Sequence, residues 1–444
     1  MRMKIAILIG KILCFIGKKM NRGSSFPGKI VNLIYPNILP HIKLPKLTIA
    51  VTASCGKTST TAAVAHILKS NGYTVGHNIE SNLLFGIITL MVDNCNLNGQ
   101  ITKDAIVMEV DERYTKNIFK ILKPNYLIIN NITRDQPPRH GHYQVVWNDI
   151  RSSFDDSVHL ILNIDDPIVH QFSFNHKGPV TYFGLGKNAL SYHKPISNNL
   201  DITYCPKCHS KLKFNYFQYG NIGHYECPKC DFKRHKPDFE ATKINLNKAY
   251  FMINDKHKIN IQNDVIYYIY NVLAAFALGS ALGIDQNKLS IQLNELSLAQ
   301  KRFERLSINN RECLLLSSKN ENCTSYNQSM LYISRQKEKK TLLFGFYRIS
   351  YRYPHKDLSW LWDIDFELLK DNNIDKIVCV GDFAYDLANR LAYCDFKDKD
   401  IIICQTIEEA ISILQNKTKG KIYAVLNSDT EKEFKKIVKQ VTIR

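Results

Sequence analysis

Short, predominantly apolar runs recur along this chain, each followed by a helical stretch, and this alternation constrains the fold more than any other feature. Such runs are typical of buried strands, and strands that alternate with helices build a mostly parallel sheet with helices on its faces. They form two series: Leu47–Val51, Ala105–Met108, Tyr126–Ile129 and His159–Leu162, then Cys313–Leu316, Thr341–Phe344, Lys376–Cys379, Ile401–Cys404 and Ile422–Val425. The sequence therefore predicts an α/β fold with two doubly wound domains.

The domain boundaries follow from where this rhythm starts, pauses and resumes. A chain of 444 residues is too long for one ordinary core. We expect an N-terminal segment over 1–45, a first α/β domain over 46–298 and a second over 299–444. A cysteine-rich, aromatic-rich insertion at about 200–238 interrupts the first domain, and alternating residues over 239–262 indicate antiparallel strands after it.

Composition narrows the class of protein and of partner. Apolar residues make up 45% of the chain and charged residues 23%, which is globular composition and excludes a disordered protein. The formal net charge is +18. Such a chain favours anionic partners: nucleotides, nucleic acid or an anionic membrane surface.

A phosphate-binding loop is predicted between the strand Leu47–Val51 and the following helix. Gly56 allows a tight turn, and the amides that follow it at the helix N-terminus can cradle phosphate oxygens. Lys57 would reach the β- and γ-phosphates, and the Thr58 hydroxyl would bind Mg²⁺. The alternative is a helix start that merely contains Gly-Lys-Thr. The candidate nucleotide-binding residues of the loop are Ser54, Gly56, Lys57, Thr58 and Ser59.

A carboxylate follows the next long strand. Glu109 directly follows the run Ala105–Met108, which places it at the carboxyl edge of the sheet, where ligands bind in such folds. We expect Glu109 to hold Mg²⁺; an ordinary acid at a strand end is the alternative.

Four of the twelve cysteines form two Cys-x-x-Cys pairs within the insertion. Two such pairs at this spacing predict a closed tetrahedral thiolate site for structural Zn²⁺, as in zinc ribbons. Basic and aromatic residues around it could bind nucleic acid, but in so small a module the aromatics serve as its core, and we expect no nucleic acid. The candidate metal ligands are Cys205, Cys208, Cys227 and Cys230.

Ten motifs in fixed order carry a resemblance to a known family. They are Ser25–Ile30, Thr52–Ser59, Asn78–Gly86, Glu109–Glu112, Asn131–Gln136, Asn163–Pro167, Tyr270–Ala275, Arg302–Glu304, Asp357–Asp363 and Gly381–Asp386. Over nearly the whole chain these resemble the Mur ligase superfamily. The four-Cys ribbon inserted in the ligase core resembles an amidating subgroup of that family.

The resemblance implies an enzyme of peptidoglycan biosynthesis that uses ATP and Mg²⁺. Such a ligase phosphorylates the α-carboxylate of D-isoglutamate in the lipid II stem peptide, and ammonia from a GatD-like glutaminase partner then displaces the phosphate. The resemblance also implies that Asn271 contacts adenine and that Arg302 reaches the nucleotide. Asp357, with Asp363 in reserve, would complete a Cys-His-Asp arrangement with the glutaminase, so Lys57 and Asp357 are the candidate catalytic residues.

Three other functions stay open at this point. The chain could be a weakened homologue that acts as a scaffold, a Mur-type ligase that acts on a different carboxylate or joins an amino acid, or a zinc-ribbon nucleic-acid binder. The last would bind in a salt-sensitive way and leaves the phosphate loop unexplained.

The N-terminal segment alternates apolar runs with lysine, and its longest uncharged stretch is Ile12–Gly17. That is far shorter than the ~20 residues of a membrane span, and no signal-peptide cleavage site follows it. We expect an amphipathic helix that packs on the protein, with contact to a membrane surface as the alternative. The expected location is the cytoplasm, with peripheral contact at the inner face of the membrane left open.

Overall fold

The computed structural model describes residues 1–20, 24–78, 81–134, 141–195, 200–246, 248–261, 266–296, 303–318, 322–346, 357–370 and 373–442. The chain divides into two compact units, the first comprising 1–133, 143–195 and 200–298 and the second chiefly 299–444. Each unit contains its own sheet and its own hydrophobic core.

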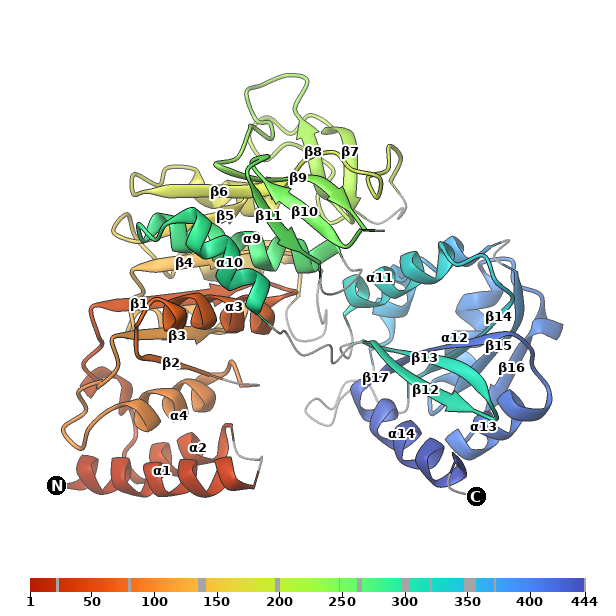
Figure 1. The fold of residues 1–444 in the computed structure, drawn as a ribbon, viewed down its shortest axis with the longest axis horizontal. Coiled ribbons are helices and arrows are strands. Elements are labelled where there is room, and N and C mark those ends of the chain that lie inside the picture. The colour runs from red at the N-terminus through yellow and green to blue at the C-terminus, as the bar shows by residue number, and fades with distance from the viewer. Residues whose placement is uncertain are drawn as a thin grey trace. The chain divides into compact units, whose positions relative to one another are not determined.

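The first unit is built on a nine-stranded sheet of order β11-β10-β9-β6-β5-β4-β1-β3-β2 (Figure 1). Its strands are β1 (Leu47–Thr52), β2 (Val75–His77), β3 (Ala105–Glu109), β4 (Tyr126–Ile129), β5 (His159–Asn163), β6 (Val180–Leu185), β9 (Phe239–Asn245), β10 (Tyr250–Ile253) and β11 (His257–Asn260). Neighbours pair in parallel from β2 to β9, and β10 and β11 extend the sheet antiparallel. The chain crosses from β3 on one side of β1 to β4 on the other, so the carboxyl end of β1 is a topological switch point, where ligands bind.

Helices cover both faces of this sheet. One face carries α1 (Arg2–Lys19), α2 (Phe26–Ile34), η1 (Leu39–His41), α4 (Leu84–Asn94), η2 (Glu112–Tyr114), α5 (Thr115–Ile118), α7 (Tyr143–Arg151), α8 (Pro167–His170) and η3 (Gln171–Ser173); the other carries α3 (Lys57–Ser70), α9 (Ile266–Ala281) and α10 (Gln286–Glu295). Successive strand residues face opposite sides: Ile49 and Val51 pack under α3 and α9, whereas Ala50 packs on the opposite face.

A small hairpin is inserted between β6 and β9. Its strands β7 (Lys213–Tyr219) and β8 (Ile222–Glu226) pair antiparallel as a separate two-stranded sheet. Gly220 forms the turn with φ +51°, a backbone conformation that glycine adopts without steric strain.

The second unit has a six-stranded sheet of order β12-β13-β17-β14-β15-β16. Its elements are β12 (Phe303–Ile308), β13 (Arg311–Ser318), α11 (Cys323–Ser334), β14 (Lys340–Gly345), η4 (Ser359–Asp363), η5 (Phe366–Leu369), β15 (Ile374–Val380), α12 (Ala384–Ala392), η6 (Asp398–Asp400), β16 (Ile401–Cys404), α13 (Ile407–Asn416), β17 (Lys421–Asn427) and α14 (Ser428–Thr442). All pairs are parallel except β12 with β13. Helices α11 and α12 pack on one face and α13 and α14 on the other.

The predicted fold class is confirmed. Every run predicted as a strand lies within an observed strand, and both sheets have helices on both faces, as the alternation requires.

Candidate functional site

The predicted phosphate loop joins the carboxyl end of β1 to the start of α3. Gly56 is the N-cap of α3, with φ +88°, a conformation that favours glycine. A Cβ on Gly56 would lie 2.2 Å from Oδ1 of Asn271, so a side chain would also collide there. The first-turn amides of α3 have no acceptor within the helix, so they can bind an anion, as at other helix N-termini. Thr58 is exposed and Ser59 half-buried in that turn.

Asn131, just after β4, holds the loop in shape. Its Oδ1 accepts a hydrogen bond from the Cys55 amide at 2.8 Å, its Nδ2 donates to the Cys55 carbonyl at 3.0 Å, and its own carbonyl accepts from the Ser54 amide at 3.0 Å. The Ser54 hydroxyl is buried and bonded to the Thr133 backbone in both directions, at 3.0 and 3.1 Å. In this structure Ser54 therefore braces the loop, and its assignment to nucleotide binding remains a prediction.

Lys57 is almost fully buried and forms an ion pair. Its Nζ lies 2.9 Å from Oε2 of Glu112, both side chains being at most 3% exposed, and it also donates to the carbonyl of Ala53. The sequence pattern pointed to Glu109 and gave no signal for Glu112, three residues later at the start of η2. Glu112 belongs to the same motif, and the strand pattern could not say which of the two acids would face Lys57.

Two carboxylate oxygens at this edge of the sheet are buried without a hydrogen-bond partner among the described residues: Oε2 of Glu109 and Oε1 of Glu112. The other Glu109 oxygen accepts from Nδ2 of Asn82 at 3.1 Å, and the Glu109 backbone is held by Asn78 at 2.7 and 2.8 Å. Unpaired buried carboxylates are costly and are the oxygen ligands that Mg²⁺ prefers. Glu109 pairs with Val51 at the end of β1, so these oxygens fit a divalent cation at the edge of the sheet from which the phosphate loop starts.

Asn271 of α9 lies beneath the loop rather than on the surface. It is 2% exposed, and its Oδ1 accepts from Oγ1 of Thr60 at 3.2 Å and from Nδ2 of Asn130 at 3.1 Å. The structure thus brings Asn271 to Gly56 from more than two hundred positions away. Its expected contact with adenine remains a prediction.

The four cysteines of the insertion converge as predicted. Their sulfur atoms all lie within 4.8 Å of one another, with Cys205 Sγ 3.5 Å from Cys230 Sγ and Cys208 Sγ 3.3 Å from Cys227 Sγ. A tetrahedral zinc with Zn–S bonds of about 2.3 Å requires sulfurs at about this separation. The donor set is closed, so it fits a structural metal.

Buried polar contacts fasten this four-cysteine module to the main sheet. Arg234 donates from Nε to Oδ1 of Asp165 at 2.9 Å and from Nη2 to Oε1 of Glu240 at 2.8 Å. The other Asp165 oxygen accepts from the Leu185 amide at 2.6 Å and from the Tyr270 hydroxyl at 2.7 Å. Burial alone would lower the pKa of Arg234, but the Asp165 and Glu240 carboxylates outweigh it and raise that pKa above its ordinary value.

His170 also packs against the four-cysteine module. Its ring stacks on Phe232 with centroids 5.1 Å apart, and its Nδ1 lies 2.7 Å from the Tyr225 hydroxyl. Burial lowers the pKa of His170 to about 3, with smaller contributions from His235 and Lys207. The ring is therefore neutral at physiological pH.

The remaining predicted residues lie in or near the second unit. Asp357 is half-buried, and its Oδ1 accepts from the Ser359 amide at 2.8 Å, which starts η4. Asp363 ends η4, and burial raises the pKa of its carboxyl group. Arg302 lies outside the described residues, so its predicted contact with the nucleotide is not placed.

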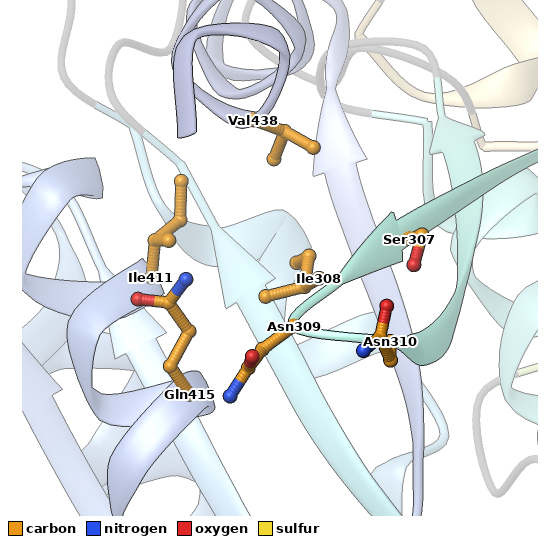
Figure 2. Close-up of a pocket in the computed structure, with 7 residues that line it drawn as sticks. All are labelled: Ser307, Ile308, Asn309, Asn310, Ile411, Gln415 and Val438. Atoms are coloured by element: carbon orange, nitrogen blue, oxygen red, sulfur yellow. The ribbon is translucent and has the colours of Figure 1, made fainter. Parts of the chain in front are cut away.

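A pocket of about 200 Å³ lies in the second unit beside the β12–β13 turn (Figure 2). It is lined by Ser307, Ile308, Asn309, Asn310, Ile411, Gln415 and Val438. None of the residues predicted for the site lines it, and it contains no ionisable side chain.

Two family models match the chain. The Mur ligase middle domain matches residues 51–226, which contain the phosphate loop and the first cysteine pair, and the MurT ligase C-terminal model matches residues 319–430. Among solved structures, a pseudomurein peptide ligase type C from Methanothermus fervidus superimposes with a TM-score of 0.69 at 20% identity, covering 94% of this chain and 84% of that one. MurF from Acinetobacter baumannii gives a TM-score of 0.63 at 16% identity, over 90% of this chain and 77% of that one. The chain therefore has the fold of the Mur ligases.

Curated relatives narrow this class. The MurT subunit of the lipid II isoglutaminyl synthase (glutamine-hydrolyzing) of Streptococcus pneumoniae is 27% identical, over 98% of this chain and 96% of that protein. The MurT subunit of Staphylococcus aureus strain COL is 28% identical over 87% and 86%. With the match to the C-terminal model, these relatives show a likeness to MurT ligase subunits that extends over nearly the whole chain.

Proposed function

We propose that this chain is the ligase subunit of a lipid II isoglutaminyl synthase. It would amidate the α-carboxylate of D-isoglutamate in the lipid II stem peptide at the expense of ATP, as a step of peptidoglycan biosynthesis. The observation that carries the proposal is the likeness to MurT subunits of that synthase along 98% of the chain. The loop before α3 and the unpaired carboxylate oxygens of Glu109 and Glu112 support the proposal, because phosphoryl transfer needs a site for phosphates and for a divalent cation.

The reaction has two stages. A carboxylate is a poor electrophile, so one of its oxygens first attacks the γ-phosphorus of ATP, and ADP leaves. Ammonia then attacks the carbonyl carbon of the acyl phosphate, phosphate leaves with its electron pair, and the nitrogen loses a proton. The acyl phosphate must be shielded from water until ammonia attacks it, because water would hydrolyse it.

Lys57 would neutralise charge on the transferred phosphoryl group. Glu112 holds its ammonium group at 2.9 Å, which keeps Lys57 close to the loop. Thr58 and Glu109 would hold Mg²⁺, which when bound would supply positive charge next to the phosphates. Asn131 and Asn271 would keep the loop in its binding conformation.

A GatD-like glutaminase would supply the ammonia as a partner subunit, and Asp357 would act towards that partner, with Asp363 as the second candidate. Support comes from the relatives' name, which describes a glutamine-hydrolysing synthase, and from a carboxylate that is half-buried in the second unit. Asp357→Asn should abolish amidation driven by glutamine and leave amidation driven by ammonium unchanged. Equal loss with both nitrogen sources would refute this role.

The four-cysteine module would hold one structural Zn²⁺. The convergence of four sulfurs supports this assignment, since thiolates at such distances repel one another without a cation. Metal analysis of the purified chain should give one zinc per chain, and Cys205→Ser should reduce it. Full zinc content in that variant would refute the site.

The decisive experiment combines the purified chain with ATP, Mg²⁺, ammonium and lipid II, followed by mass spectrometry of the stem peptide. Free ammonium replaces the glutaminase, so a missing partner cannot explain a negative result. Conversion of one hydroxyl to an amide, lost in Lys57→Ala, would support the proposal. Its absence from folded, zinc-loaded protein would overturn it.

We also propose that this reaction takes place at the inner face of the cytoplasmic membrane, where a lipid-linked precursor is accessible from the cytoplasm. No helix among the described residues is long and apolar enough to cross a membrane.

A further inference from the structure

Helix α1 has two apolar faces, of which the protein covers one. The inward face packs against α2 and α4 through Ala6, Ile7, Gly10 and Cys14. The approach is close: a Cβ on Gly10 would lie 2.5 Å from Val31 and 2.6 Å from Val92. This face anchors α1 as part of the fold (Figure 1).

The outward face consists of large apolar side chains that water reaches. Their exposed fractions are 45% for Ile5, 48% for Leu8, 51% for Ile12, 61% for Phe15 and 45% for Ile16. Steps of three and four residues place them on one stripe of the helix, opposite the inward face. A surface helix normally turns polar residues outward, so a contiguous apolar stripe indicates a binding surface. We call these five residues the α1 stripe.

Charge on and around the helix shows which occupant suits the stripe. Residues 1–79 contain eleven Lys and Arg and neither Asp nor Glu. Lys4, Lys11 and Lys18 recur every seven residues, so they form a row along one edge of the helix. Asp93 of α4 bonds Lys18 at 2.7 Å, and its carbonyl accepts from Lys11 at 3.2 Å, whereas Lys4 is exposed.

The C-terminal end of α1 adds another cation beside the stripe. The Nζ of Lys19 lies 4.7 Å from the ring centroid of Phe15, and both residues are exposed. Two further large apolar side chains, Phe26 and Leu33 of α2, are 55% and 65% exposed. An apolar stripe edged by lysines on a helix that does not span a bilayer is the pattern of an interfacial helix.

We propose that the α1 stripe lies in the interfacial region of an anionic lipid bilayer, with Lys4 and Lys19 against the headgroups. The biological reason for such binding rests on the proposed function, because a lipid-linked substrate would be found at the membrane surface. The surface itself comes from the exposure of the stripe and the charge beside it. Apolar side chains would enter the headgroup–acyl boundary while the inward face stays packed on α2 and α4.

The test is flotation of the full chain with phosphatidylcholine vesicles that contain or lack phosphatidylglycerol. We expect binding only to the anionic vesicles, weakened by salt because surface charges are screened. The double variant Ile12→Ser/Phe15→Ser should reduce binding at least about tenfold, since two large apolar groups no longer leave water. Lys4→Gln/Lys19→Gln should reduce it about fivefold for each lysine.

Matched controls distinguish binding through the α1 stripe from nonspecific hydrophobic binding to vesicles. Leu97→Ser and Ile291→Ser replace apolar residues of the same unit that are 42% and 60% exposed, and they should bind like the parent chain. All replaced side chains are exposed, so every variant should keep its thermal unfolding midpoint. Failure of the parent chain to bind anionic vesicles, or unchanged binding of the stripe variant, would overturn the proposal.

Two other occupants of the stripe can be recognised with the same variant, by its oligomeric state in solution and by its binding to the glutaminase. A dimer in solution that Ile12→Ser/Phe15→Ser dissociates would show that a second copy covers it. Loss of glutaminase binding in that variant, without loss of vesicle binding, would show that a protein partner covers it. Either result overturns the membrane assignment.

A second readout separates this inference from the proposed function. With ammonium and ATP, the stripe variant should amidate a short-chain, water-soluble lipid II analogue normally but amidate lipid II in vesicles poorly. Vesicle binding without amidation of either substrate would overturn the proposed function and leave the membrane surface standing. Amidation of both substrates at the parent rate would overturn the membrane surface alone.

Discussion

The first unit buries two ion pairs of equal length whose surroundings differ. Arg234 and Asp165 lie 2.9 Å apart, as do Lys57 and Glu112, and all four side chains are at most 6% exposed. Around Arg234 the bonds are complete, because Asp165 also accepts from Leu185 and Tyr270, and Arg234 also reaches Glu240. Beside Lys57, one oxygen of Glu112 and one of Glu109 have no partner among the described residues.

This difference separates structural charge from functional charge. A buried ion pair with complete hydrogen bonds holds two parts of the fold together. Removing one member leaves the other charge buried without a counter-charge. A buried carboxylate oxygen without a partner costs free energy of folding, and a protein keeps such a cost where a ligand later repays it. The Arg234 pair thus joins the four-cysteine module to the sheet, whereas the Lys57 pair has the unpaired neighbouring oxygens that a ligand site requires.

The largest effect should come from Lys57. Replacing it by alanine should lower ATP-dependent amidation roughly 10³-fold, because a cation that stabilises the transferred phosphoryl group is lost. Steady-state assays with ammonium as the nitrogen source measure this. Lys69→Ala, an exposed lysine at the far end of α3, is the control and should leave the rate unchanged. Similar rates for Lys57→Ala and the parent would remove Lys57 from the site.

Arg234→Met should cost about 3–5 kcal/mol of unfolding free energy, because it leaves Asp165 buried without its cation. Urea unfolding at neutral pH measures this. The control lies in the same module: Lys213 and Glu226 are 2.9 Å apart but 66% and 36% exposed, so Lys213→Met should cost less than about 1 kcal/mol. Equal costs for the two variants would contradict the structural role of the buried pair.

His170 extends the comparison to pH. The unfolded chain binds a proton on this histidine near its ordinary pKa, but the folded chain does so only near about 3. The unfolded state therefore gains protons first, and stability falls as pH drops below about 6.5. Between pH 7.5 and 5.5 this group should remove about 1.4 kcal/mol.

The pH dependence of urea unfolding, compared between the parent chain and His170→Phe, isolates this contribution. Phenylalanine fills the same space beside Phe232 and does not titrate. The variant should show a shallower loss of stability over that range. Parallel pH profiles would mean that His170 is not buried as the structure has it.

Glu109→Gln should have the smallest effect on stability and a specific effect on binding. Removing a buried, partly unpaired negative charge should leave the unfolding free energy within about 1 kcal/mol of the parent, on the stabilising side. Affinity for ATP should lose its dependence on Mg²⁺, which calorimetric titration with and without the metal measures. A destabilisation as large as that of Arg234→Met would place Glu109 among the structural charges.

Several elements of the site were predictable because their signal is local. The turn at Gly56 and the lysine after it lie within one short stretch between a strand and a helix. The four cysteines were predicted to converge from the Cys-x-x-Cys spacing of each pair. The strands were equally readable, since buried parallel strands are almost continuous apolar runs. The second acid, Glu112, was harder: it lies in the same motif as Glu109, and only the turn into η2 directs it to Lys57.

The sequence by itself determined two α/β sheets, a phosphate loop and a four-cysteine module, because strand periodicity, turn residues and ligand spacing act over a few neighbouring positions. Only the tertiary structure decided that Asn131 and Asn271 converge on the loop, that Arg234 pairs with Asp165, and that α1 turns one apolar face to water. These contacts depend on which strands become neighbours and which face of a helix finds a partner. Both are settled by the packing of the whole unit, in which residues far apart along the chain compete for the same buried positions.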